Sequence, residues 1–212
     1  TEMQWRLLDK NNVPVVFVIN QLDHEKAKFD EVLNQLKDVF GNKIVPFQFP
    51  VSVGEGFNSI VDVLSNKLLK YDNSGKATVE DVPAELTDKV EELHQFLVEA
   101  AAEGDEALME KFFEDGTLSE EDVAKGLKLS IKNRDMYPLI CVCSKKNIGV
   151  DALLDFTINN IIAPNEADPI KTNSGVELNS NKTDELAAFV FKTGIETHIG
   201  EVNYIRLFGG EL

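Results

Sequence analysis

The sequence predicts a mixed α/β protein, and three observations lead to that prediction. A short run rich in β-branched residues, Val13 to Ile19, is typical of a buried parallel strand. An amphipathic helical pattern follows from Lys26 to Phe40. A second apolar run, Tyr137 to Cys143, is followed by a helical pattern after Gly149. Strands that alternate with helices in this way favour an open sheet with parallel strands.

Polar residues follow the first strand directly, in the order Asn20-Gln21-Leu22-Asp23. Ligands of open α/β sheets bind at the carboxyl ends of the strands, so a small-molecule site is expected here. An ionised aspartate only accepts hydrogen bonds, whereas an asparagine both donates and accepts. A guanine ring offers the complementary edge, with N1–H and N2–H2 as donors and O6 and N7 as acceptors. The same residues also fit a plain strand-to-helix turn.

The segment between the two apolar runs is expected to begin with strands and to continue with helices. Residues 45–53 contain two prolines and favour an edge strand, residues 57–64 are interpreted as a short helix, and residues 67–71 as a strand that ends in a turn. From residue 83 to 131 the chain is acidic and helical, and Ser119-Glu120-Glu121-Asp122 resembles a capping box. A solvated helical face is the simplest interpretation of the acidic residues, and a surface that binds a protein is the alternative.

The two ends of the chain have different characters. Residues 2–10 fit the end of a helix with Met3, Trp5 and Leu7 on or near its inward face. Residues 164–181 are rich in Pro, Asn and Ser without periodicity, which indicates a linker. Residues 186–192 and 202–208 are interpreted as strands joined near Gly200, the opening hairpin of a further β domain.

Composition restricts the class of function. The formal net charge of −16 argues against non-specific nucleic-acid binding by most of this surface. No apolar run approaches the roughly 20 residues that a membrane helix needs. Cys141 and Cys143 lack partner ligands for a metal site and are expected to be buried thiols of a reducing, cytoplasmic environment.

In this order, the segments resemble translation elongation factor G, from the middle of its GTP-binding domain to the start of its second domain. Residues 20–23 are similar to the guanine motif Asn-Lys-x-Asp, with Gln21 in place of lysine, and Cys143-Ser144-Lys145 falls where the family has its second guanine loop. Further similarities lie at Phe49-Pro50, Gly54 and Phe57, at Pro83 to Leu86, and at Phe191-Lys192, Gly200, Arg206 and Gly210. Their collinearity over nearly the whole chain supports the resemblance.

The resemblance implies the C-terminal part of a P-loop GTPase domain with an α+β insert, followed by the opening strands of a β-barrel domain. The implied boundaries are 1–44 for the GTPase part with the guanine motif and 45–132 for the insert. They continue as 133–165 for the last strand and helix of the GTPase domain, 166–183 for a linker and 184–212 for the start of the second domain.

The implied cofactor site recognises guanine and contains no catalytic residue and no metal ligand. Its residues are Asn20, Gln21, Asp23, Cys143, Ser144 and Lys145. The sequence lacks a G-x-x-x-x-G-K-S/T loop, a switch threonine and an Asp-x-x-Gly segment. The chain is therefore expected to be an inactive fragment whose intact parent binds GTP or GDP, with no nucleotide bound to the fragment itself.

The implied function is ribosomal translocation in the cytoplasm, with the insert touching the stalk protein of the large ribosomal subunit. Gln21 is shorter than lysine and uncharged, so guanine binding is expected to be weaker or altered. The alternative is a non-catalytic ribosome- or protein-interaction module of a paralogue that has lost productive use of GTP. Little direct nucleic-acid contact and no membrane contact are expected. The incomplete sheet and hairpin expose strand edges through which chains could pair.

Overall fold

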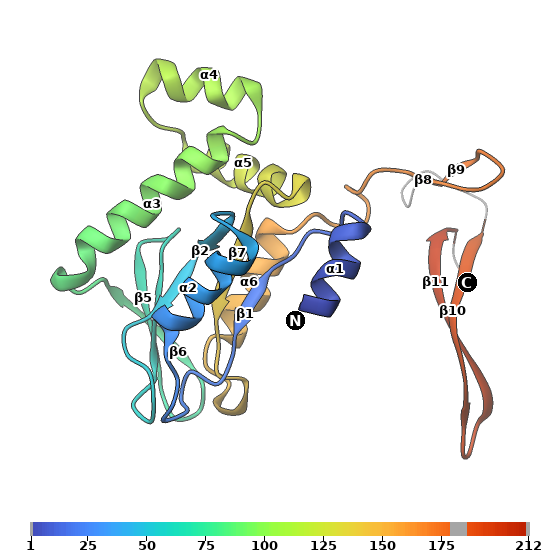
Figure 1. Cartoon of the computed structure of the whole chain (residues 1–212), viewed down its shortest axis with the longest axis horizontal. Coiled ribbons are helices and arrows are strands. Elements are labelled where there is room, and N and C mark those ends of the chain that lie inside the picture. The colour runs from blue at the N-terminus through green and yellow to red at the C-terminus, as the bar shows by residue number, and fades with distance from the viewer. Residues whose placement is uncertain (1, 179–185, 211–212) are drawn as a thin grey trace. The chain divides into compact units, whose positions relative to one another are not determined.

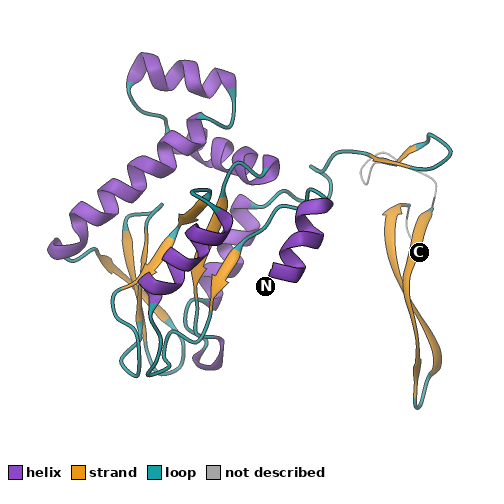
Figure 2. Ribbon diagram, viewed as in Figure 1, coloured by secondary structure: helices purple, strands orange, loops and turns teal. Residues whose placement is uncertain are grey.

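The computed structural model describes residues 2–178 and 186–210, and the chain divides into two compact units (Figure 1). The first unit spans Thr1–Ile161 and the second Ile162–Leu212. The first contains a parallel sheet, an antiparallel sheet and a group of helices, and the second contains two hairpins (Figure 2). The mixed α/β class predicted from the sequence is confirmed.

A three-stranded parallel sheet forms the centre of the first unit. Its order is β1-β7-β2, with bounds Phe17–Ile19, Tyr137–Cys141 and Ile44–Pro46. Helices α2 (Phe29–Phe40) and α6 (Val150–Asn160) pack on this sheet through the buried Phe29 and Phe156. The boundary predicted at residue 45 falls inside β2, so this sheet extends at least to Pro46.

Helix α1 (Glu2–Lys10) contacts the sheet through one aromatic residue. The Trp5 ring lies 4.6 Å from the Phe40 ring and 4.8 Å from the Tyr137 ring, centroid to centroid. The prediction that Met3 and Leu7 also lie on or near the inward face was wrong, because Met3 is 86% exposed and Leu7 63% exposed. One large aromatic ring buries enough apolar area to anchor a short helix without them.

An antiparallel sheet follows, with the order β3-β4-β5-β6. Its bounds are Gln48–Pro50, Ser59–Asp62, Lys67–Tyr71 and Ala77–Asp81. The helix predicted over residues 57–64 was wrong, since this segment holds β4. Ile60 pairs with Leu69 and Val61 with Phe49, and both β-branched residues are fully buried. A short apolar run has no periodicity to separate strand from helix, and here the neighbouring strands decide.

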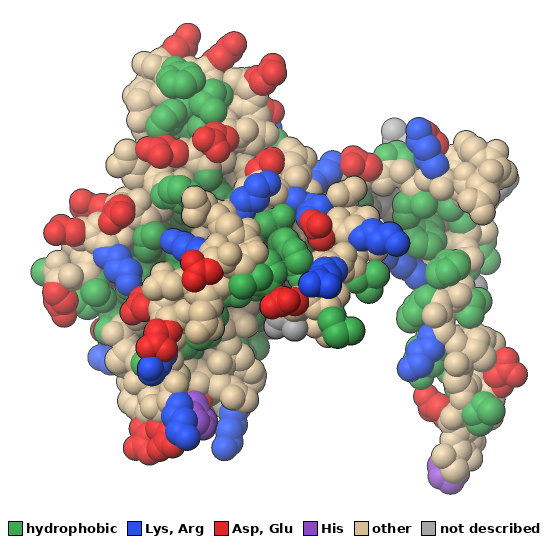
Figure 3. All heavy atoms as spheres, viewed as in Figure 1, with side chains coloured by type: hydrophobic (Ala, Val, Ile, Leu, Met, Phe, Trp, Pro, Cys, Tyr) green, Lys and Arg blue, Asp and Glu red, His purple; other side chains and the backbone are tan. Residues whose placement is uncertain are grey.

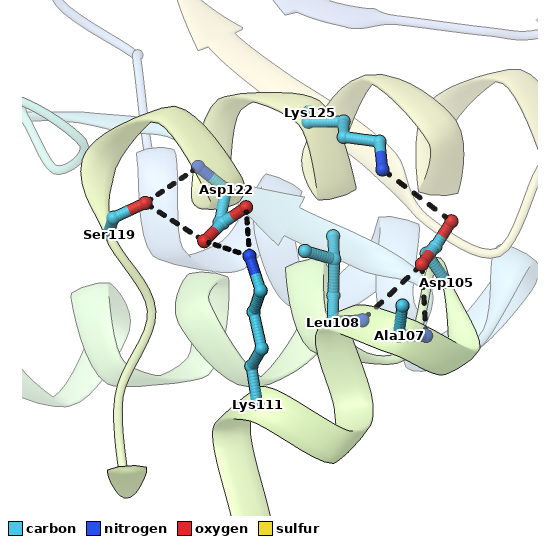
Figure 4. Close-up of polar contacts among 7 residues, drawn as sticks. All are labelled: Asp105, Ala107, Leu108, Lys111, Ser119, Asp122 and Lys125. Atoms are coloured by element: carbon cyan, nitrogen blue, oxygen red, sulfur yellow. Dashed lines mark hydrogen bonds and ion pairs between the residues drawn. The ribbon is translucent and has the colours of Figure 1, made fainter.

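The acidic region is helical, as predicted. A 3₁₀ turn at Ala84–Leu86 leads into α3 (Thr87–Ala102), α4 (Glu106–Asp115) and α5 (Glu120–Asn133). Ser119 caps α5 by accepting a hydrogen bond from the Asp122 backbone N–H at 3.1 Å. Figure 4 shows two ion pairs between the α4 segment and the first half of α5, with Lys111 3.0 Å from the Asp122 carboxylate and Lys125 3.8 Å from Asp105. Asp105 also caps α4, because it accepts from the backbone N–H groups of Ala107 and Leu108.

Helices α3 and α5 approach each other closely at one glycine. A Cβ atom at Gly126 would lie 2.2 Å from the backbone oxygen of Ala101. Nearby, the Ser130 hydroxyl donates to the Ala100 carbonyl at 2.8 Å. The absence of a side chain at residue 126 therefore sets the distance between the two helices.

The described part of the second unit contains two antiparallel hairpins. Strands β8 (Ile170–Lys171) and β9 (Glu177–Leu178) form a small one inside the region predicted as a linker, while β10 (Ala187–Glu196) and β11 (Gly200–Gly209) form a long one. The long hairpin is consistent with the beginning of a β domain. Residues 179–183 of the predicted linker and residues 184–185 of the predicted second domain lie outside the described residues. Within residues 2–178 and 186–210, no helix combines the length and apolarity needed to cross a membrane.

Gly126→Ala is expected to lower the free energy of unfolding by about 1–3 kcal/mol, because the added methyl overpacks the α3–α5 contact. Helix propensity alone predicts the opposite sign, a gain of up to about 1 kcal/mol. Urea denaturation measures the difference. Gly56→Ala is the matched control, since nothing lies within 4 Å of a Cβ atom there. A Gly126→Ala chain as stable as the wild type would contradict this packing.

Candidate functional site

Two loops leave the same edge of the parallel sheet. Strand β1 ends at Ile19, which pairs in parallel with Cys141 at the end of β7. The Val142 backbone N–H donates to the Ile19 carbonyl at 2.9 Å, which keeps the two strands together at their last residues. The segments 20–23 and 143–146 therefore begin side by side at the carboxyl ends of their strands, where open α/β sheets bind ligands.

Asn20 joins the two loops through its amide. Its Oδ1 accepts from the Ser144 backbone N–H at 3.1 Å and from the Gln21 backbone N–H at 2.8 Å. Its Nδ2 donates to the Ser144 hydroxyl at 3.0 Å. The amide of residue 20 thus positions the second loop and still has one N–H that these bonds do not use.

Asp23 lies beside the second loop and is held ionised. Its carboxylate lies 3.2 Å from the Lys146 ammonium, and its side chain is 17% exposed. The Cys143 thiol, which donates a hydrogen bond to it, and then Lys146 keep the pKa of Asp23 below its ordinary value, against the opposing effect of burial. The site therefore presents a negative acceptor next to the amide of residue 20.

Cys143 is suited to structure rather than to nucleophilic chemistry. Its side chain is buried, and burial, followed by the Asp23 carboxylate, raises the pKa of its thiol. The thiolate is the nucleophilic form, so a raised pKa disfavours attack. Cys141 is buried too, both cysteines are free thiols, and the described part of the chain holds no group of side chains able to bind a metal ion.

Gln21 and Lys145 are the remaining residues of the predicted site, and both are exposed. Gln21 has a left-handed backbone, with φ of 62°, and with Asn20 it lines a hollow of about 320 Å³ beside α2. Asp23 and Ser144 do not line that hollow. The structure therefore brings together Asn20, Asp23, Cys143 and Ser144. Gln21 and Lys145 follow in the same two loops and are exposed at the surface.

Sequence reasoning missed Lys146 and Gly149. The adjacent lysines at 145 and 146 gave no sign of which one pairs with Asp23. Gly149 has φ of +73°, and a Cβ there would lie 2.4 Å from the Cys141 carbonyl oxygen, so the second loop needs glycine to return to the sheet. A glycine directly before a helical pattern was the only signal of this close approach.

Comparisons with known proteins give a family match and a similar solved structure. The family described as "Elongation factor Tu GTP binding domain" matches residues 1–163. The chain is also similar to the crystal structure of a protein from Thermus thermophilus, with 26% sequence identity and a TM-score of 0.82. That similarity covers 99% of this chain and 29% of the other, so the chain spans less than a third of that protein's length.

Lys146→Ala is expected to raise the pKa of Asp23 toward its ordinary value of 3.8, because the nearest cation is removed. A carbon-detected NMR titration of the Asp23 carboxyl measures this shift. Lys145→Ala is the matched control and should leave the titration unchanged. Equal shifts in both variants would show that Lys146 has no specific contact with Asp23.

The interaction of Asp23 with Cys143 and Lys146 also determines how the stability of the fold changes with pH. Because the pKa of Asp23 is lowered in the folded chain, ionised Asp23 stabilises the fold above the ordinary value of 3.8. That contribution is lost as the pH falls through the lower, folded pKa.

Proposed function

The chain belongs to the translational GTPase family of the elongation factor Tu GTP-binding domain, and from this premise we propose that it is the guanine-recognition part of an elongation factor G-like protein. The parent protein then acts in ribosomal translocation in the cytoplasm. One observation carries the proposal: the Asn20 amide and the Asp23 carboxylate converge beside the loop that contains Ser144. These groups match the edge of a guanine base.

Asp23 is the residue that selects guanine in this proposal. Its ionised carboxylate accepts from N1–H and N2–H2 of the base, a pair of donors that adenine does not offer. An ionised carboxylate has about four acceptor positions, so the contacts with Cys143 and Lys146 leave room for a base. The unused N–H of Asn20 suits the N7 acceptor, and the backbone N–H of Lys145 suits O6.

Gln21 makes this site weaker than a lysine would. The family's lysine stem covers the face of the base, and glutamine is shorter and uncharged. The loss is on the order of 1–3 kcal/mol, or roughly 5- to 150-fold in affinity. This residue is also the observation that favours the second candidate, a paralogue that binds ribosomes without productive use of GTP. Phosphate-loop and switch segments in the longer protein would distinguish the two, since the second candidate predicts that they are eroded.

The proposed partners rest on the family and on the acidic side chains of the insert. Translational GTPases act with the ribosome, and we assign the helical insert to the stalk protein of the large subunit. Asp and Glu side chains project along α4 beside apolar ones (Figure 3). Phe113 on this helix is 77% exposed, although Phe112 is partly buried. An acidic, partly apolar helix suits a basic protein surface better than RNA. In the second unit, the exposed Phe189, Phe191 and Ile195 of β10 offer a surface for pairing between copies.

Isothermal titration of the 212-residue chain with GDP is expected to show no micromolar binding. Most of the affinity and all of the hydrolytic chemistry of such sites come from the phosphate loop and Mg²⁺, and this sequence holds no such loop. Micromolar binding would contradict this division of roles.

Base selectivity tests the proposed site in the longer protein that contains this chain. Asp23→Asn replaces an acceptor with a group that also donates, so GDP affinity should fall roughly 10- to 150-fold and xanthosine diphosphate should become the better ligand. Asp30→Asn, at an exposed position in the first turn of α2, is the matched control. Unchanged selectivity in Asp23→Asn would overturn the guanine assignment.

Binding to the stalk protein tests the partner. The whole chain should bind it at tens of micromolar or tighter, and the double variant Glu110→Lys/Glu114→Lys on α4 should weaken that binding. Asp30→Lys/Asp38→Lys on α2 makes the same change of charge and should leave the binding to the stalk protein unchanged. Equal weakening by both pairs would indicate only a response to net charge.

A further inference from the structure

The antiparallel sheet of the insert reaches both loops of the candidate base site. Its β3–β4 loop contacts the first one, where the Gly54 backbone N–H donates to the carbonyl of the buried Leu22 at 2.8 Å. Its β5–β6 hairpin contacts the second one, at Lys146 and Asn147. The guanine loops therefore rest on the insert as well as on their own sheet.

Gly75, at the tip of the β5–β6 hairpin, lies against the second of these loops. It is buried and has φ of +77°. A Cβ atom there would lie 2.8 Å from the Asn147 Cβ and 2.9 Å from the backbone oxygens of Asn147 and Lys146. Two of the three nearest atoms are backbone, so a side chain would displace the loop itself rather than a flexible group.

The hairpin that carries Gly75 is held by side-chain hydrogen bonds. At its tip the Asp72 carboxylate accepts from the backbone N–H groups of Ser74 at 2.8 Å and Lys76 at 3.0 Å. At the last residue of β5, directly before the turn, the Tyr71 hydroxyl donates to the Asp151 carboxylate at 2.8 Å, which ties the insert to the first turn of α6. Tyr71 is 3% exposed, and burial together with Asp151 raises the pKa of its hydroxyl, so the hydroxyl remains a donor.

We propose that Gly75 and Tyr71 are positioning residues of the guanine site: through them the hairpin of the insert fixes the loop 143–147 against Asn20 and Asp23. This inference rests on the proposed function, which makes the loop part of a guanine site, whereas the contacts themselves do not depend on that function. Its consequence is coupling between the β5–β6 hairpin and the guanine site. A ligand or partner that displaces the β5–β6 hairpin changes the affinity for guanine, and by reciprocity a bound guanine changes the affinity for that partner.

A hollow lies beside this contact. It measures about 590 Å³ and is lined by three segments that meet there, residues 55–58, 71–74 and 145–148. Two of the segments belong to the insert and the third to the second guanine loop. The hollow therefore lies between the hairpin and the loop that follows β7.

The test compares two glycine variants of the whole 212-residue chain. Gly75→Ala and Gly116→Ala introduce the same methyl at left-handed positions, with φ of +77° and +74°, but nothing lies within 4 Å of a Cβ at residue 116. In Gly75→Ala, hydrogen exchange at the Ser144 amide should accelerate roughly tenfold, the change expected when about one hydrogen bond is lost. The pKa of Asp23 should rise, because Cys143 and Lys146 move away from it. Neither quantity should change in Gly116→Ala.

Tyr71→Phe keeps the test decisive if Gly75→Ala does not fold. It removes only the hydroxyl that reaches Asp151 and should change both quantities in the same direction by a smaller amount. Identical behaviour of the Gly75 and Gly116 variants at Ser144 and Asp23 would overturn the proposal, as would an unchanged Asp23 titration in Tyr71→Phe. No nucleotide enters this experiment, so its failure leaves the guanine assignment intact. The base-selectivity experiment fails or succeeds separately.

Discussion

The site depends on one register: Ile19 of β1 lies opposite Cys141 of β7 in a parallel ladder. Parallel strands bring the ends of two segments more than 100 residues apart to the same edge of the sheet. The Asn20 amide can then reach Ser144, and Asp23 can reach Lys146. A register shift of one residue would reverse the faces of all side chains on a strand and separate these groups.

The second constraint is close approach of backbone to backbone, which glycine permits at several places in the described part of the chain. Gly126 allows α3 and α5 to touch, Gly149 returns the second loop to the sheet, and Gly75 seats the hairpin on that loop. The exposed ion pairs that hold α4 contribute less, because solvent screens them. Packing therefore fixes the body of the insert, while charge acts at its surface and at Asp23.

The sequence predicted those parts of the fold that are controlled by local patterns. The strand before Asn20, the helix that Ser119 caps and the convergence of residues 20–23 with 143–145 all agree with the structure. Predictions from local patterns failed where contacts with neighbouring elements determine the structure. Residues 59–62 became a strand because β3 and β5 lie on either side of them, and Lys146 rather than Lys145 paired with Asp23 because of the turn after β7. The contact of Gly75 with Asn147 joins segments whose sequences do not indicate that they meet.

We propose that two loops at one sheet edge form a guanine-specific half-site. A structure of the longer protein with GDP tests it most directly. The base is expected beside Gln21, with the Asp23 carboxylate within hydrogen-bonding distance of N1–H and N2–H2 and with the loop 143–147 in the position that it has here. A base bound away from residues 20–23, or one whose N1–H faces another group, would contradict the guanine assignment.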